Sequence, residues 1–123
     1  MNKLSLVNNT DDNKHITFTI SKGILSELKQ ILVSSENYNL KKKSIWINEA
    51  IMMLSQDPNY KEIIYNADQS TDDFVIDKIN MTFQQRCSFA LIRREVVKAY
   101  PDMEAPQSAI IRAAIFSRLF RKR

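Results

Sequence analysis

Few residues of this 123-residue chain are suited to covalent or metal chemistry, since it has one Cys, Cys87, and one His, His15. A single Cys excludes an internal disulfide, and with one His it leaves no ligand set for a zinc site. The sequence also has no Gly-rich phosphate loop and no nucleophile, base and acid set typical of a hydrolase. We therefore expect no enzyme activity, metal or cofactor, with His15 on a strand surface and Cys87 packed as a small apolar residue.

Polar side chains that can form hydrogen bonds recur at alternate positions in two short segments. In residues 15–20 they alternate with Ile and Phe, and in residues 79–83 they alternate with Ile, Met and Phe. Such alternation, rich in β-branched and aromatic types, predicts a half-buried strand. The first strand would turn Ile16, Phe18 and Ile20 inward and leave its polar side chains on the other face.

Helical patterns follow each predicted strand. After the first strand Ser21 supplies an N-cap oxygen, and apolar residues then recur at helical spacing in both halves of the chain. Prolines limit these helices, because Pro58 and Pro101 cannot continue a helix and Pro106 suits a first helical turn. The predicted helices span residues 22–34, from 43 to before Pro58, 85–99 and 106–121, with a turn at 34–39.

The order strand, helix, helix therefore occurs twice, which is an internal repeat. The strand segments correspond at a spacing of 63 residues, and residues 108–115 match 44–51 at a spacing of 64. One such unit leaves the backbone of its strand unpaired and the apolar face of that strand uncovered. We expect a mainly α fold in which the two strands form an antiparallel ribbon within one chain and four helices close over one face.

The charge is unevenly distributed, although the formal net charge is only +4. Residues 1–56 carry +2, residues 57–77 carry −5 and residues 78–123 carry +7. We divide the chain into a flexible tail (1–13), a first module (14–56), an acidic and solvated connector (57–77) and a second module (78–123) that folds with the first. Basic modules around an acidic connector are typical of nucleic-acid binding, although basic surfaces also occur for solubility alone, so charge does not decide between the two.

Membrane association is not expected from the sequence. No charge-free apolar run approaches the roughly 20 residues that a membrane span needs, and the first 14 residues lack the apolar centre of a secretory signal. We therefore expect a cytoplasmic protein.

Two stretches of each module carry a resemblance to a known family. The run from His15 to Leu28, followed by Lys43-Ser44, resembles a ribbon-helix-helix protein of the Arc, CopG and MetJ kind, and residues 78–83 with 108–115 resemble a second copy. The tandem arrangement is similar to the TraY family of relaxosome accessory proteins. This resemblance implies a monomeric pseudodimer that binds double-stranded DNA as a conjugation accessory factor or a transcriptional repressor. It also implies a relaxase or another conjugation protein, and further copies on DNA, as candidate partners.

In this family the ribbon enters the major groove and its outward side chains touch the edges of the bases. Lys can donate to guanine, Asn can pair bidentately with adenine, and Thr offers a hydroxyl and a methyl group. The alternative is that these side chains merely occupy a solvated strand face. Carried over residue by residue, the base-contacting residues are His15, Thr17, Thr19, Lys78, Asn80 and Thr82.

The resemblance also implies phosphate contacts at the start of each module's second helix, where free N–H groups favour an anion. The Gly that usually precedes this helix is absent from both copies. The more basic second module predicts stronger phosphate attraction on the C-terminal half and binding that weakens steeply with salt. The residues implied at these helix starts are Lys42, Lys43, Ser44, Gln107 and Ser108.

A protein-interaction module is the alternative function, such as an antitoxin-like or assembly component. Its helical faces and acidic connector would then bind a protein partner. The outward strand side chains discriminate between the two hypotheses, because only the DNA-binding one depends on them.

Overall fold

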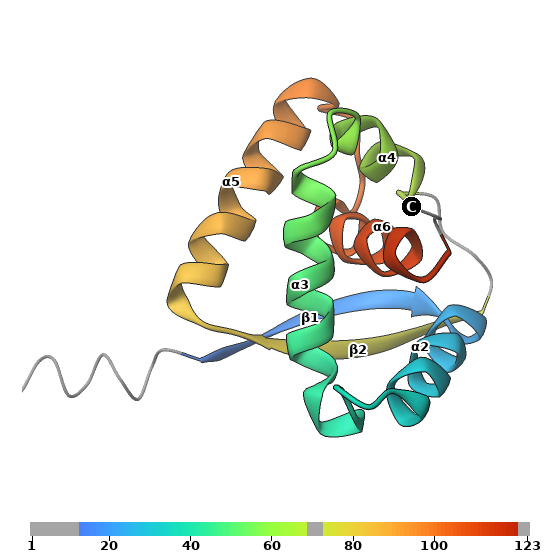
Figure 1. Cartoon of the computed structure of the whole chain (residues 1–123). Helices are drawn as coiled ribbons and strands as arrows, with labels where there is room; N and C mark the ends of the chain where they lie inside the picture. Colours follow the sequence, from blue (N-terminus) through green and yellow to red (C-terminus); the bar gives the residue numbers. More distant parts are fainter. Residues whose placement is uncertain (1–12, 69–72, 121–123) are drawn as a thin grey trace, which may run out of the picture.

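Two strands of the protein form an antiparallel ribbon, and α3 (Lys43–Ser55) crosses one face of it (Figure 1). The computed structural model describes residues 13–68 and 73–120. Strand β1 (Lys14–Ser21) pairs with β2 (Phe74–Met81), with Thr17 opposite Lys78. The expected mainly helical fold with a two-stranded antiparallel ribbon is confirmed. The other elements are α2 (Lys22–Ser34), a 3-10 turn (Leu40–Lys42), α3 (Lys43–Ser55), α4 (Tyr60–Asn66), α5 (Phe83–Ala99) and α6 (Pro106–Phe120).

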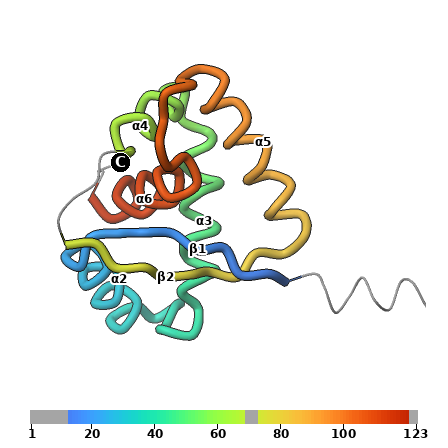
Figure 2. Tube along the Cα trace, turned by 180° about the vertical axis from the view of Figure 1, so that it is seen from behind, coloured from blue at the N-terminus to red at the C-terminus, as the bar shows by residue number. Residues whose placement is uncertain are grey.

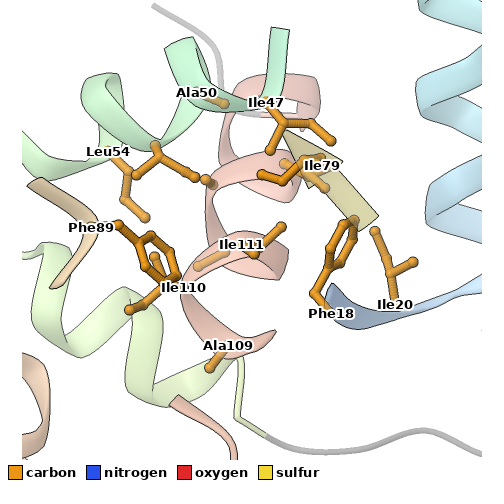
Figure 3. Close-up of a cluster of buried hydrophobic side chains, with 14 of the residues drawn as sticks. Phe18, Ile20, Ile47, Ala50, Leu54, Ile79, Phe89, Ala109, Ile110 and Ile111 are labelled. Atoms are coloured by element: carbon orange, nitrogen blue, oxygen red, sulfur yellow. The ribbon is translucent and has the colours of Figure 1, made fainter. Parts of the chain in front are cut away.

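The core lies between the inner face of the ribbon and the helices α3 and α6. Phe18 and Ile20 of β1 are 2% and 1% exposed, as the alternation predicted, and Ile16 is half-buried. Figure 3 shows side chains of both strands and of α3, α5 and α6 meeting in one cluster. Trp46 of α3 is buried in the same core. Both halves of the chain therefore contribute to a single core.

Strand β2 ends earlier than the alternation of residues 79–83 predicted. Thr82 is the N-cap of α5, since its hydroxyl accepts a hydrogen bond from the Gln85 N–H at 3.1 Å. The Gln85 side chain in turn accepts one from the Thr82 N–H at 2.9 Å, which completes a capping box. Helix α5 consequently begins at Phe83, whose side chain is 60% exposed instead of facing the core.

The helix caps that follow the two strands are 61 positions apart, whereas alternation gave a spacing of 63 between the strand segments. Ser21 caps α2 as Thr82 caps α5, and these two caps are 61 positions apart. The buried Phe18 likewise corresponds to the buried Ile79. Helix α5 has 17 residues where α2 has 13, so the halves differ in length before their second helices.

The acidic segment expected to be a solvated connector is folded into the structure. It contains α4, in which Ile64 is fully buried. The Tyr65 ring stacks on Tyr100 with centroids 4.2 Å apart, and its hydroxyl donates to Asp102 Oδ2 at 3.1 Å. This hydrogen bond and the negative charge of Asp102 raise the pKa of Tyr65.

Hydrogen bonds also join the end of α4 to the second half of the chain. Asp68 accepts hydrogen bonds from the backbone N–H groups of Glu104 and Ala105, at 2.9 and 3.0 Å. Arg112 of α6 donates from Nε and Nη2 to the Ala67 carbonyl, at 3.0 and 2.8 Å. Residues 60–68 of this segment thus hold the loop before α6 and are not the solvated linker that was predicted there.

Helix α5 lies at the surface and exposes Cys87, contrary to the expectation that this side chain packs in the core. The inward face of α5 carries Phe89, Ile92 and Val96. Cys87 lies two positions before Phe89, which at 3.6 residues per turn places it on the far side of the helix.

Within residues 13–68 and 73–120, no helix has both the length and the apolarity needed to cross a bilayer.

Candidate functional site

The outward face of the ribbon carries a strip of exposed polar side chains, and Figure 2 shows the molecule from this side. His15 lies opposite Asn80, and Thr17 lies opposite Lys78. All four of these residues are exposed, so His15 occupies a strand surface as expected. Alternation along each strand points them away from the core.

The edge of β2 is covered by the first turns of α3. Ser44 Oγ accepts a hydrogen bond from the Asn80 N–H at 2.9 Å. Asn48 donates from Nδ2 to the Asn80 carbonyl at 2.9 Å, and to the Ser44 carbonyl at the same distance. Asn48 is the one buried polar residue among those the structure describes, and these bonds satisfy its amide group.

The edge of β1 is covered in the same way by α6. Ser108 Oγ accepts a hydrogen bond from the Thr19 N–H at 3.0 Å, and Gln107 Nε2 donates to the Thr17 carbonyl at 2.7 Å. Arg112 donates from Nη1 to the Thr19 carbonyl at 3.1 Å and to Thr19 Oγ1 at 2.9 Å. Burial lowers the pKa of Arg112, and the negative charge of Asp68 opposes this shift.

These contacts correspond between the two edges. Ser44 accepts a hydrogen bond from the Asn80 N–H, and Ser108 accepts one from the Thr19 N–H. The two serines are 64 positions apart in the sequence, and the two donors are 61 positions apart. The backbone groups of these residues point out of the ribbon, so the outward pairs are the non-hydrogen-bonded pairs, whose side chains lie closest together. These contacts occupy backbone groups at both edges, which hinders the addition of further strands there.

Most side chains expected to bind phosphate make contacts within the protein instead. Ser44, Ser108 and Gln107 bond to the strand edges, as described above. Lys43 Nζ forms an ion pair with Asp77 Oδ2 at 2.6 Å. Lys42 is exposed at the start of α3, beside the exposed Lys41. These two lysines therefore provide the exposed positive charge at this helix start.

The charge beside α6 is opposite to what the basic second module led us to expect. The loop before α6 carries Asp102 and Glu104, and Asp68 is hydrogen-bonded to it. The exposed basic residues Arg93 and Arg94 lie on α5 instead. The start of α3 therefore has more positive charge nearby than the start of α6 has.

One of the six residues expected to contact bases does not lie on the ribbon. Thr82 is a helix cap and does not belong to β2. Ile76, two positions before Lys78, occupies an outward position opposite Thr19. The alternation pattern missed Ile76 because it began the strand at Ile79, five residues after its start at Phe74. It also ended the strand two residues too late, an error that the capping box at Thr82 could have prevented. The outward residues at the three pairs around Thr17 and Lys78 are His15, Thr17, Thr19, Ile76, Lys78 and Asn80, and the next outward pair is Ser21 with Phe74.

Replacing Thr82 by alanine is expected to lower the free energy of unfolding by about 1 kcal/mol, because the α5 cap is lost. Chemical denaturation followed by circular dichroism measures this change. The Thr82→Ser variant keeps a capping hydroxyl and should retain most of the stability. Equal stability of Thr82→Ala and the wild type would contradict the capping role.

The outward face presents groups that can form hydrogen bonds with a binding partner. Its side chains offer hydrogen-bond donors and acceptors without a paired nucleophile and base. No group of three or more His, Cys, Asp and Glu side chains able to hold a metal ion occurs in the part of the chain that the structure describes. Comparison with protein-family models, curated proteins and solved structures finds no match to this chain.

Proposed function

We propose that this chain binds double-stranded DNA in a sequence-specific manner by inserting its ribbon into the major groove. The observation that carries the proposal is the exposed strip of polar side chains on the outward face of a two-stranded ribbon. Strands in a ribbon are about 4.8 Å apart, and the major groove is about 12 Å wide, so a ribbon fits it.

The proposal includes a tandem ribbon-helix-helix fold in which one chain forms a pseudodimer. The corresponding N-caps at Ser21 and Thr82 support it, as do the corresponding edge contacts at Ser44 and Ser108. Each second helix covers the edge of the strand from the other half of the chain. In a dimer with a twofold axis, the second helix of each copy would cover the strand edge of the other copy in the same way.

The chemistry of the outward side chains supports recognition of bases. Lys78 can donate to guanine O6 and N7, and Asn80 can both donate to and accept from adenine. His15 and Thr17 add further hydrogen-bonding groups beside them. Since these side chains project from strands whose backbone is held at both edges, little ordering is left to occur on binding.

Phosphate contacts belong to the proposal on the α3 side of the ribbon. Lys41 and Lys42 are exposed in the turn just before Ser44, whose hydroxyl is bonded to the β2 edge. They would position the protein on the DNA backbone without contributing sequence information. Because the loop beside α6 is acidic, we propose that these contacts come mainly from one flank.

The biological role we propose is that of a cytoplasmic conjugation accessory factor or a transcriptional repressor. Both roles use the same DNA-binding face and differ in where the target site lies. A relaxase or another transfer protein would be the partner in the first role, with further copies of the chain on the DNA. A relaxase gene adjacent to the gene for this chain would favour the accessory role.

Selection from a pool of random duplexes, followed by measurement of mass in solution, tests the proposal. We expect a non-palindromic site, since the two strands present different side chains, bound at least 10³-fold more tightly than unrelated DNA. The free protein should have the mass of one chain at low concentration. Failure to enrich any site would contradict DNA recognition and favour the protein-interaction alternative. A symmetric site bound by two chains would contradict the single-chain pseudodimer.

A further inference from the structure

An apolar side chain interrupts the polar strip on the outward face of the ribbon. Ile76 is 76% exposed, more than any other large apolar residue of the described chain. It lies in β2 opposite Thr19 and two positions from Lys78. The inner face of β2 already supplies Ile79 and Met81 to the core, so burial within this chain does not account for Ile76.

The ribbon face consequently has two chemically different ends. At one end His15 lies opposite Asn80, and both side chains are polar. At the other end Ile76 lies opposite Thr19, whose hydroxyl oxygen already accepts a hydrogen bond from Arg112. The central pair of Thr17 and Lys78 separates the two ends.

We propose that Ile76 contacts the 5-methyl group of a thymine, and that the target site therefore has a thymine beneath the Ile76 end of the ribbon. This inference rests on the proposed DNA-binding function. The thymine methyl is the apolar group that base pairs present in the major groove. A hydrogen-bonding base edge placed against Ile76 would lose water without gaining a partner, which disfavours other bases there.

Substitution of deoxyuridine for thymidine tests this contact, because it removes the methyl group and retains the base pairing. Each thymidine of the selected site is replaced in turn, and the Kd is measured by fluorescence anisotropy. We expect the Kd of the wild type to rise about fourfold at one or two positions on one side of the site, the effect of losing one buried methyl-sized group.

The Ile76→Ala variant identifies the side chain responsible. Its Kd for the thymidine site should be raised by about the same factor, and deoxyuridine at the sensitive position should cause no further rise. Val33→Ala is the matched control, because Val33 is a 68% exposed aliphatic residue on α2. This control should retain both the wild-type Kd and the wild-type sensitivity to deoxyuridine.

Two results would overturn the thymine contact while leaving DNA recognition intact. One is selective binding by the wild type that no deoxyuridine substitution weakens. The other is an equal deoxyuridine effect in the wild type and in Ile76→Ala. Absence of selective binding to any duplex would reject both the proposed function and this contact.

Discussion

Replacing Lys78 and Asn80 together by alanine is expected to remove most of the discrimination between the target site and unrelated duplex DNA. Each well-formed bidentate contact to a base contributes about 1–3 kcal/mol of discrimination, so the double variant should lose on the order of a hundredfold or more. Both side chains are exposed on the outward face, and the fold should be unaffected. Competition between labelled target and unlabelled random duplex, at one fixed salt concentration, measures the loss.

Two control variants separate base contact from general effects. Lys98→Ala removes an equal positive charge from an exposed position on α5 and should leave the discrimination unchanged. Thr82→Ala should lower stability without changing discrimination, because Thr82 is a cap and not a member of the outward strip. Full discrimination by the Lys78 and Asn80 double variant would mean that the ribbon face does not contact bases, and the protein-interaction alternative would then be preferred.

Replacing Phe18 by alanine is expected to lower the free energy of unfolding by about 3–5 kcal/mol, because it removes most of a buried aromatic side chain and leaves a cavity. Phe18 is 2% exposed and belongs to the core that both halves share. That loss is a large part of the total stability of an ordinary domain, which is about 5–15 kcal/mol. Denaturation followed by fluorescence of Trp46, the single tryptophan, and by circular dichroism measures it.

The shared core further predicts that both signals change together, in the wild type and in Phe18→Ala. Trp46 reports on α3, whereas circular dichroism reports on the helices of both halves. Thr17→Ala, at the neighbouring exposed position, should change the unfolding free energy by less than about 0.5 kcal/mol. Separate midpoints for the two signals would show that the halves unfold independently and would contradict a single folded unit.

The sequence predicted the elements with clear end signals most accurately. The expected helix over residues 22–34 matches α2 because Ser21 caps it and apolar residues keep a regular helical spacing. Pro106 begins α6 as expected. Alternation placed β2 less well, because Ile79, Met81 and Phe83 continue the strand pattern into a helix whose start is determined by the Thr82 cap.

The connector shows where reasoning from charge failed. Its acidic side chains suggested solvation, but Asp68 accepts hydrogen bonds from backbone groups of a loop more than 30 residues away. No periodic pattern within the segment indicates such a contact. In the site, alternation found Lys78 and Asn80, whereas the pairing register placed Ile76 opposite Thr19.

Asn48 and Arg112 occupy corresponding positions at the two ribbon edges, yet one is neutral and the other is a cation. A dimer of identical chains must accept every substitution twice, once on each side of its axis. In a single chain each edge can differ, and Arg112 contacts Ala67 in addition to Thr19. In the single-chain pseudodimer proposed above, covalent linkage would let each half of the ribbon acquire its own base preference, one residue at a time.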